Sequence, residues 1–464
     1  MTRLEVWLDQ DLVGWLSHDG AKNQFAFAYT PDWREGQRSY PISPRIPLVP
    51  VTGQTPESHS AEVRQFFENL LPEGEALDHA AQANGIAKSN LVGLMVALGK
   101  ETTGALRVAV ARDDTQARNQ AIDQRNGRPR EDLRHDHDHD EPRRVTREEL
   151  SERIRRRAEL PFSVWDGKVR LSIAGYQDKI AIYKQGDAWY LVEGPRLAST
   201  VILKPMPTRP QLAELPGNEY LCMQLAQRCG LEVAATHLVH VPEPVLFVTR
   251  FDRIEQEDRV RRLHLIDGCQ ALGLSASMKY ERPYGDNPDV RNIRDGATYA
   301  KLFSLLGQSP QPARDRQALL RWAIFQVLIG NTDAHGKNVS FFCNVEGLRL
   351  APGYDLVCVP ALRDGGLSST YAMAIGDAFT DAEVTPFEWA SFAKECGLPL
   401  RMVSRELERL AVRVRDVMPR VAADAGSAGV SEKIIASVGS IVEENCRRHA
   451  AMATEILRVN TVNL

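Results

Sequence analysis

The stretch GNTDAHGKN, residues 330–338, brings an aspartate, a histidine, a lysine and two asparagines together directly after the apolar run LLRWAIFQVLI. Asp333 and Asn338 lie five residues apart within this stretch. Transfer of a phosphoryl group from ATP uses an aspartate to orient the attacking hydroxyl and an oxygen ligand, such as an asparagine, to hold magnesium. The pair predicts this chemistry, with Asp333 as the catalytic residue and Asn338 as a magnesium ligand.

The catalytic loop of protein kinases, H-R-D-x-x-x-x-N, has the same separation, and three further residues then fall into the order that kinases use. A hairpin around residues 346–347 leads to Asp355, in the place of a second magnesium ligand. Upstream, the strand VILK ends at Lys204, and the helix NEYLCMQLA carries Glu219 as a partner for that lysine. Each motif alone arises by chance, so the prediction depends on their common order along the chain.

To bring these residues to one cleft, the chain needs a sheet that carries Lys204 and a helical part that carries the polar loop. We therefore expect an α+β fold of the two-lobe protein-kinase-like type. Residues 1–111 read as a small N-terminal α+β subdomain and residues 112–158 as a charged, flexible insertion. We expect a mostly antiparallel sheet lobe with the phosphate loop and the hinge at residues 159–254. We expect a larger helical lobe with the catalytic loop at residues 255–464.

The composition limits the possible classes of function. The chain has 464 residues, of which 43% are hydrophobic and 25% charged, enough for two or three globular domains. Its 57 basic and 61 acidic residues provide no bulk positive field, which argues against unaided DNA binding. Seven cysteines without a C-x-x-C pair argue against disulfides and zinc ribbons. No run of about 18 apolar residues or signal peptide is found, so we expect a cytoplasmic protein without membrane contact.

The expected insertion is rich in charged residues and poor in apolar ones, and it includes the run HDHDHD at residues 135–140. Alternating imidazole and carboxylate groups can bind zinc or nickel adventitiously. Such a composition is more often typical of a solvated charged segment than of a metal site. His335 is a second candidate metal ligand, but a zinc site normally needs three or four protein ligands at matching spacings. We therefore expect His335 to be a structural residue of its loop.

The motifs together resemble the HipA family of bacterial serine/threonine kinases, the toxin half of HipA/HipB-type toxin–antitoxin modules. The resemblance extends over nearly the whole chain and rests on FFENLLPEGEAL, GKETTGAL, SIAGYQDK, ILKP, NEYLCMQLA, TRFDR, CQALGLSASMKYE, GNTDAHGKN and PGYDL. Family members usually carry an acidic pair before CQALG. This chain has Ile266 and Asp267 there, so one carboxylate is missing.

The resemblance implies the same roles that the spacing suggests. Asp333 would be the catalytic aspartate, and Asn338 and Asp355 would hold magnesium. Lys204 would bridge the α and β phosphates of ATP, supported by Lys179. The cofactors implied are therefore ATP and Mg²⁺.

Further ATP contacts are implied in the phosphate loop, in the hinge at residues 248–251 and in the polar loop itself. These residues are Ala174, Gly175, Tyr176, Val248, Arg250, Phe251, His335 and Lys337. The phosphate loop has one glycine instead of the kinase G-x-G-x-x-G pattern, although backbone amides alone favour anions. In this family a loop serine is autophosphorylated, which corresponds to Ser172 here. Its added negative charge would repel ATP and switch the enzyme off.

Three functions of different class follow. The first is a kinase toxin that phosphorylates a translation component, such as an aminoacyl-tRNA synthetase, and is neutralised by a HipB-like helix-turn-helix antitoxin. DNA would then be contacted only indirectly, through the antitoxin. The second is a nucleotide-binding pseudokinase scaffold or corepressor, against which the complete set Asp333, Asn338, Asp355 and Lys204 argues. The third is a metal-dependent hydrolase that uses Asp333, His335 and the histidine run.

Overall fold

The computed structural model describes residues 2–111, 141–157, 159–166, 168–169 and 177–460. The chain folds into a mixture of helices and antiparallel sheets, as predicted. Four residues of the predicted phosphate loop lie outside the described residues, as does the histidine run at residues 135–140. The four are Ser172, Ala174, Gly175 and Tyr176.

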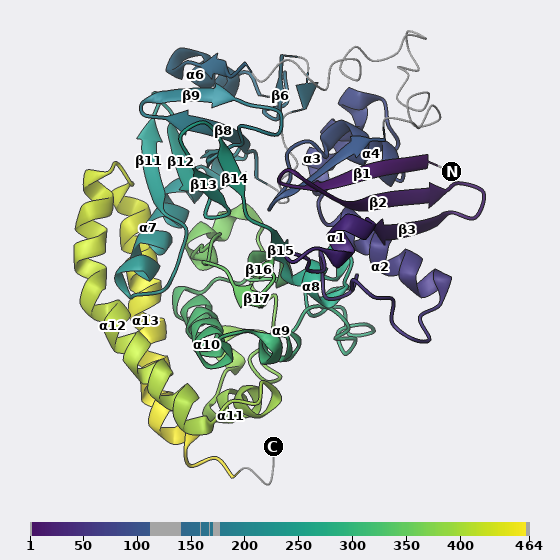
Figure 1. Cartoon of the computed structure of the whole chain (residues 1–464). Coiled ribbons are helices and arrows are strands. Elements are labelled where there is room, and N and C mark those ends of the chain that lie inside the picture. Colours follow the sequence, from purple (N-terminus) through teal and green to yellow (C-terminus); the bar gives the residue numbers. More distant parts are fainter. Residues whose placement is uncertain (1, 112–140, 158, 167, 170–176, 461–464) are drawn as a thin grey trace.

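The N-terminal unit is built on a four-stranded antiparallel sheet in the order β3-β2-β1-β4. Its strands are β1 (Thr2–Leu8), β2 (Asp11–Asp19), β3 (Gln24–Tyr29) and β4 (Leu106–Val110). Leu4, Val6 and Leu8 alternate along β1 with more exposed residues, and they are buried. This period of two gives the sheet one apolar face, against which the helices of the unit pack (Figure 1).

The helices of this unit are α1 (Pro31–Glu35), α2 (Pro56–Glu68), α3 (Gly74–Asn84) and α4 (Leu91–Leu98). Helices α1 and α2 begin in the same way, with a threonine cap followed by proline. The hydroxyl of Thr30 accepts the amide of Trp33, and that of Thr55 accepts the amide of Ser58. Proline at the first position has no amide to leave unpaired, so the local sequence fixes both helix starts.

The second sheet has six strands, all antiparallel to their neighbours, in the order β11-β12-β10-β8-β9-β5. Its strands are β5 (Arg143–Val145), β8 (Ile180–Gln185), β9 (Ala188–Leu191), β10 (Val201–Pro205), β11 (Thr236–His240) and β12 (Pro244–Thr249). Helix α7 (Leu215–Arg228) packs on β11 and β12, and Gly230 follows it with a left-handed φ of 78°. The helix predicted to carry Glu219 is therefore present.

Residues 141–157 correct the predicted boundaries, because they belong to this sheet and not to an insertion. Strand β5 pairs with β9, and helix α6 (Arg147–Arg155) follows it. Leu150 and Ile154 are four residues apart on α6, and both are buried. Two apolar residues on one helical face are enough to dock a short helix, although the average composition of the segment is polar. Residues 112–140, the rest of the predicted insertion, lie outside the described residues.

Three small sheets complete the strands. The hairpin predicted around residues 346–347 is confirmed, since Asn344 pairs with Gly347 at its turn. The remaining strands are β6 (Val164–Trp165), β7 (Lys168–Val169), β13 (Arg253–Glu255), β14 (Val260–Arg262), β15 (Leu265–Asp267), β16 (Ser340–Asn344) and β17 (Gly347–Leu350). Strand β15 pairs with β16, and β16 with β17, so the polar loop enters a sheet directly after Asn338.

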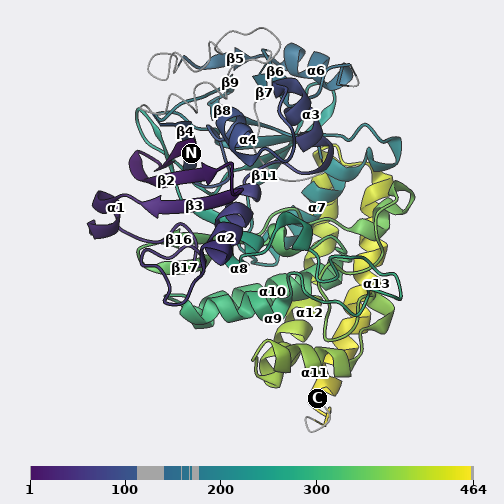
Figure 2. The same cartoon turned by 90° about the vertical axis from the view of Figure 1, so that its right-hand side faces the viewer.

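The C-terminal part is mainly helical, and its long helices α12 and α13 lie side by side in both views (Figures 1 and 2). Its α-helices are α8 (Gly268–Leu272), α9 (Tyr299–Leu305), α10 (Pro312–Ile329), α11 (Pro386–Glu395), α12 (Leu400–Ser427) and α13 (Glu432–Ile456). Short 3₁₀ turns occur at Pro210–Leu212, Ala276–Met278, Leu306–Gln308, Gly336–Asn338, Val359–Gly365 and Asp381–Glu383. None of the helices in the described ranges is both long and apolar enough to cross a membrane.

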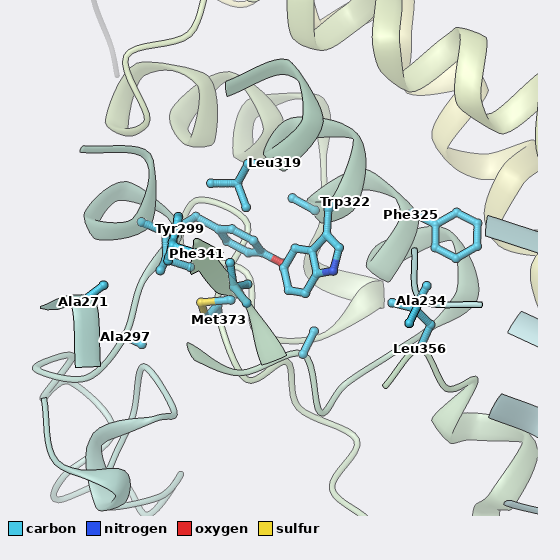
Figure 3. Close-up of a cluster of buried hydrophobic side chains, with 14 of the residues drawn as sticks. Ala234, Ala271, Ala297, Tyr299, Leu319, Trp322, Phe325, Phe341, Leu356 and Met373 are labelled. Carbon is cyan, nitrogen blue, oxygen red and sulfur yellow. The ribbon is translucent and has the colours of Figure 1, made fainter. Parts of the chain in front are cut away.

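Helix α10 runs through the core of the helical part and fixes the start of the polar loop. Figure 3 shows its Trp322 beside Tyr299, with Phe341 nearby. The ring centroids of Trp322 and Tyr299 are 6.3 Å apart, and Phe341 is buried. The helix ends at Gly330, which has a left-handed φ of 69°. The amide of Asn331 then donates back to the carbonyl of Gln326 at 2.8 Å, which closes the helix end. The polar loop therefore leaves a rigid anchor.

A buried cluster of charged residues joins the N-terminal unit to the six-stranded sheet. Asp252 accepts hydrogen bonds from Arg250 and Arg253, each at 2.8 Å, and from the amide of Gly104 at 2.9 Å. Glu101 pairs with the same two arginines and with Arg262, at 3.2 to 3.3 Å. Burial would raise the pKa of Glu101, but the three guanidinium groups outweigh it and lower that pKa to about 2.

Replacing Glu101 with glutamine should lower the free energy of unfolding by about 3 to 5 kcal/mol near neutral pH, because the buried Arg262 would lose its carboxylate partner and Arg250 and Arg253 would share Asp252 alone. The pKa of Glu101 is lowered on folding from 4.5 to about 2, so its stabilisation is fully present above pH 4.5 and is lost as the pH falls toward 2. Urea denaturation across this range should show the two proteins converging. Glu35→Gln, at a residue whose side chain is 74% exposed, is the matched control. Equal midpoints for parent and Glu101→Gln near neutral pH would contradict the prediction.

Candidate functional site

A cavity of about 980 Å³ lies where the six-stranded sheet, the N-terminal unit and the helical part meet. Its volume is in the range of pockets that hold a nucleotide-sized ligand. The structure brings together in its wall all of the predicted site residues that it describes. These are Lys179, Lys204, Glu219, Val248, Arg250, Phe251, Asp333, His335, Lys337, Asn338 and Asp355.

Lys204 on β10 is the centre of a buried ion trio in this wall. Its Nζ donates to Glu219 Oε1 of α7 at 2.7 Å, and it also pairs with the carboxylate of Asp355. Burial would lower the pKa of Lys204, but the two carboxylates outweigh it and raise that pKa well above its usual range. Burial raises the pKa of Glu219 to about 7, although Lys204 opposes the rise. The strand lysine and the helix glutamate are therefore partners.

Asp355 is held in an unusual backbone conformation at the other end of this trio. Its φ of 55° lies in the left-handed region, which residues other than glycine rarely adopt. The side-chain amide of Asn331 donates to its backbone carbonyl at 3.2 Å, which ties the residue to the end of α10. Burial would raise the pKa of the Asp355 carboxyl, but Lys204 and Lys179 hold it well below its usual range.

Lys179 adds a second cation to the same wall, one residue before β8. It is buried, and the loss of water lowers the pKa of its ammonium to about 8, against the opposing charge of Asp355. The closeness of Lys204 lowers it further. The two lysines thus lie in the same wall as the carboxylates of Glu219 and Asp355, which balance their charge.

Asp333 is fixed by hydrogen bonds on both its backbone and its side chain. Its amide donates to Asn331 Oδ1 at 3.1 Å, and its carbonyl accepts from Asn338 Nδ2 at 2.9 Å. The phenol of Tyr280 donates to its carboxylate at 2.7 Å. Loss of bulk water in the cavity raises the pKa of Asp333, while Tyr280 and Lys279 oppose this rise. The carboxylate is thus directed into the cavity at a defined place.

Asn338 and Asp355 fit the requirements of a magnesium ion that is shared with a ligand. The hydrogen bond from Asn338 to Asp333 uses its amide nitrogen, so its side-chain oxygen is the group suited to a cation. Magnesium is commonly bound by one or two protein side chains together with phosphate oxygens. The described part of the chain contains no group of three or more His, Cys, Asp or Glu side chains placed to hold a metal by themselves.

His335 is buried next to the ring of Tyr280, with ring centroids 5.2 Å apart. Burial and the charge of Lys279 hold its pKa well below the usual range, so the imidazole is neutral. Within the described residues its Nδ1 atom is buried without a hydrogen-bond partner. An unpaired buried polar atom in a cavity wall is a place where a bound ligand or water can form a bond.

Lys337 has a different environment from the one expected of an ATP contact. Its Nζ donates to Asp267 Oδ2 at 2.6 Å, to Asn69 Oδ1 at 2.9 Å and to the Asn69 carbonyl at 3.1 Å. An ammonium has three donors, and all three are used here. Lys337 therefore ties the polar loop to the N-terminal unit. Asp267, the one acid left of the family's pair, also caps α8, whereas Ile266 is fully buried in β15.

Arg250 likewise differs from the expected nucleotide contact. Its guanidinium donates to Asp252, Glu101, Ser199 and the carbonyl of Thr102, within the buried cluster described above. Its backbone amide donates to Thr200 at 2.9 Å. These bonds engage both the guanidinium group and the backbone amide of Arg250. The hinge was predicted from its position in the sequence alone. That position gave no sign that the side chain of Arg250 would bond to Glu101, which is distant in the sequence.

Three residues of the site were missed from the sequence. Tyr280 bonds Asp333, Asn69 bonds Lys337, and Glu73 pairs with Lys279 at 2.6 Å in the cavity wall. All three belong to motifs noted above, FFENLLPEGEAL and CQALGLSASMKYE. One sequence signal could have pointed to such residues, namely a polar residue within an otherwise apolar motif. Asn69 in FFENLL is an example.

The comparisons with known proteins agree over nearly the whole length. Family models match the HipA N-terminal domain at residues 4–109 and the HipA-like C-terminal domain at residues 171–419. The serine/threonine-protein kinase toxin HipA of Shewanella oneidensis is 36% identical over 421 residues, which cover 90% of this chain and 89% of that protein. A putative kinase of Sinorhizobium fredii is 32% identical over 428 residues, 91% of this chain and 92% of that protein.

A solved complex of Shewanella oneidensis HipA, HipB and operator DNA contains a chain of the same fold. The TM-score is 0.82 at 33% sequence identity, covering 99% of this chain and 100% of that chain. Lys204 on a strand pairs with Glu219 on a helix, and both line the same cavity as Asp333 and Asn338. This arrangement is kinase-like. The fold and the site thus define a kinase-like protein. The chain belongs to the HipA family.

The contact between Asn69 and Lys337 predicts that the N-terminal unit steadies the polar loop. In Asn69→Ala, Lys337 loses a charge-assisted bond, and amide exchange in residues 333–338 should become about 10-fold to 100-fold faster. Hydrogen-exchange mass spectrometry of peptides covering this loop measures the change. Asn84→Ala is the matched control, because Asn84 Nδ2 bonds the carbonyl of Ala80 within α3 at 2.8 Å. Unchanged exchange in both variants would show that the loop does not depend on this contact.

Proposed function

We propose that the chain is an ATP-dependent serine/threonine protein kinase with a two-lobe kinase-like fold, and that it acts as a growth-inhibiting toxin. The observation that carries the proposal is the buried trio of Lys204, Glu219 and Asp355, which shares one cavity wall with Asp333 and Asn338. The lysine–glutamate pair and the aspartate after the hairpin are what an active kinase must bring together. Membership in the HipA family and relatives named as kinases support it.

The residues of the cavity then take the following roles. Lys204 and Lys179 hold the phosphates, while Asn338 and Asp355 hold magnesium. Bound ATP and Mg²⁺ supply the phosphoryl group and neutralise the charge that develops on it. Asp333 orients the hydroxyl of the protein substrate and accepts its proton. The catalytic effect of this group of residues is positioning and charge stabilisation, because the reaction needs little covalent chemistry from the protein.

The rest of the nucleotide is assigned to the neighbouring strands. The backbone at Val248 and Phe251 and the carbonyl of Arg250 flank the adenine ring, and His335 Nδ1 offers a further polar contact. The backbone of residues 174–176, Ala174, Gly175 and Tyr176, covers the phosphates. Ser172 is the proposed autophosphorylation site, where roughly two added negative charges would repel ATP and inhibit the enzyme.

The partners follow from the relatives. Since the related Shewanella oneidensis HipA was solved with HipB and operator DNA, we propose a HipB-like helix-turn-helix antitoxin for this chain. It would neutralise the kinase and bring it to DNA. The protein substrate is proposed to be a translation component, such as an aminoacyl-tRNA synthetase. A nucleotide-binding pseudokinase that acts as a corepressor is the alternative, and a metal-dependent hydrolase is the third.

Asp333→Asn should lower phosphoryl transfer by about 100-fold or more, because the hydroxyl proton loses its acceptor, while ATP binding stays within a few-fold. Incubation with labelled ATP and magnesium, followed by mapping of the labelled residue, measures transfer, and calorimetry measures binding. Asp258→Asn, an exposed acid in the turn between β13 and β14, is the control and should label like the parent.

Label on Ser172 in the parent and its absence in Asp333→Asn would establish the kinase. If neither labels and the intact mass of the parent shows no phosphate already present, the pseudokinase is correct. Metal-dependent hydrolysis without any protein labelling would instead establish the hydrolase.

The antitoxin proposal predicts how the chain behaves with operator DNA. With 57 basic and 61 acidic residues, the chain alone should leave operator DNA unshifted in a gel at physiological salt. Adding the helix-turn-helix antitoxin should give a complex that migrates more slowly than the antitoxin–DNA complex. A shift by the purified chain alone would contradict indirect binding.

A further inference from the structure

Tyr280 lies against the predicted catalytic residue without being part of the kinase motifs. It follows the 3₁₀ turn Ala276–Met278, and its phenol donates a hydrogen bond of 2.7 Å to Oδ1 of Asp333. Asp333 accepts this bond with one oxygen and retains Oδ2 for another partner. The two carboxylate oxygens therefore differ: Oδ1 is held by Tyr280, and Oδ2 faces the cavity.

The segment that carries Tyr280 is fixed to the polar loop by several contacts. The amide of Gly336 donates to the carbonyl of Lys279 at 2.9 Å, and the ring of Tyr280 packs edge-on against His335. A side chain at Gly336 would place its Cβ 2.5 Å from that of Ala297, so only glycine permits this close approach. The phenol is thus placed by the backbone and by ring packing.

The other charged groups near Asp333 have different partners or signs. Lys279 pairs with Glu73 at 2.6 Å, Asp355 pairs with Lys204, and His335 is neutral. Asp355 and Glu73 are carboxylates and repel the charge of Asp333. Tyr280 differs from these groups because it is a neutral donor with a fixed direction. It can orient the Asp333 carboxylate without competing for the phosphates as a cation would.

We propose that Tyr280 is a positioning residue for phosphoryl transfer, which holds Oδ1 of Asp333 so that Oδ2 faces the hydroxyl of the protein substrate. The inference rests on the proposed kinase function. In the step concerned, the hydroxyl oxygen forms a bond to the γ-phosphorus as the bond from that phosphorus to the ADP oxygen breaks. The hydroxyl proton passes to Oδ2, and the bond electrons leave with ADP. Tyr280 neither gains nor loses a proton.

The test uses autophosphorylation of the full chain at varied concentrations of labelled ATP with magnesium, under single-turnover conditions. In Tyr280→Phe the maximal rate constant should fall about 10-fold to 100-fold, with the half-saturating ATP concentration within about twofold of the parent. Tyr284→Phe, at a tyrosine of the same segment that is 59% exposed, should behave like the parent. Phenylalanine keeps the ring contact with His335, so the fold is expected to persist, with a melting temperature close to the parent's.

A second variant separates the hydrogen bond from the ring. With 4-aminophenylalanine at position 280, a donor returns to the place of the phenol, and most of the lost rate should be recovered. Parental rates in Tyr280→Phe would overturn the proposal, as would a faster rate, which would mean that the phenol blocks the substrate site. Loss of rate in both variants would assign a packing role instead. A parent that binds ATP, carries no phosphate by intact mass and still never labels would overturn the kinase function, and this inference with it.

Discussion

The pairing of one buried cation, Lys204, constrains much of the rest of the molecule. A buried ammonium without carboxylate partners is strongly unfavourable, so Glu219 and Asp355 must both reach it. They come from α7 and from the segment after β17, which are separate in sequence from β10. This requirement therefore holds α7 against the six-stranded sheet. It also holds the segment that follows β17 against both of them. The cavity lies where these three segments meet.

The N-terminal unit is bound into the same arrangement by charged contacts and cannot be regarded as an appendage. Glu101 reaches the arginines that follow β12, and Asn69 reaches Lys337 in the polar loop. If the unit moved away, Arg262 would lose its carboxylate partner and Lys337 would lose two of its three hydrogen-bond acceptors. The kinase-like part thus depends on a unit that ordinary protein kinase motifs do not include. The position of the polar loop is set partly by residues more than two hundred positions earlier in the chain.

The sequence was informative where the signal is local and failed where it is tertiary. The spacing of Asp333 and Asn338, the hairpin before Asp355 and the lysine–glutamate pair all follow from motifs and turn residues. Residues 141–157 were assigned to an insertion because their average composition hides the two apolar residues that dock α6. The contacts of Lys337 and Arg250 depend on distant partners, Asn69 and Glu101. No pattern within one segment could reveal them, since the same side chains are suited to phosphate.

The charges around the cavity bear on how the proposed nucleotide and its metal ion would bind. Lys179 and Lys204 balance Glu219 and Asp355, so this part of the wall has no excess positive charge when all four are ionised. A triphosphate alone would add several negative charges beside two buried carboxylates, which is unfavourable at low dielectric. Asp355 and Asn338 would hold a divalent cation that offsets this repulsion, and Lys204 could then exchange one anionic partner for another. With the function proposed above, the balance of these four charges would favour the magnesium complex over free ATP.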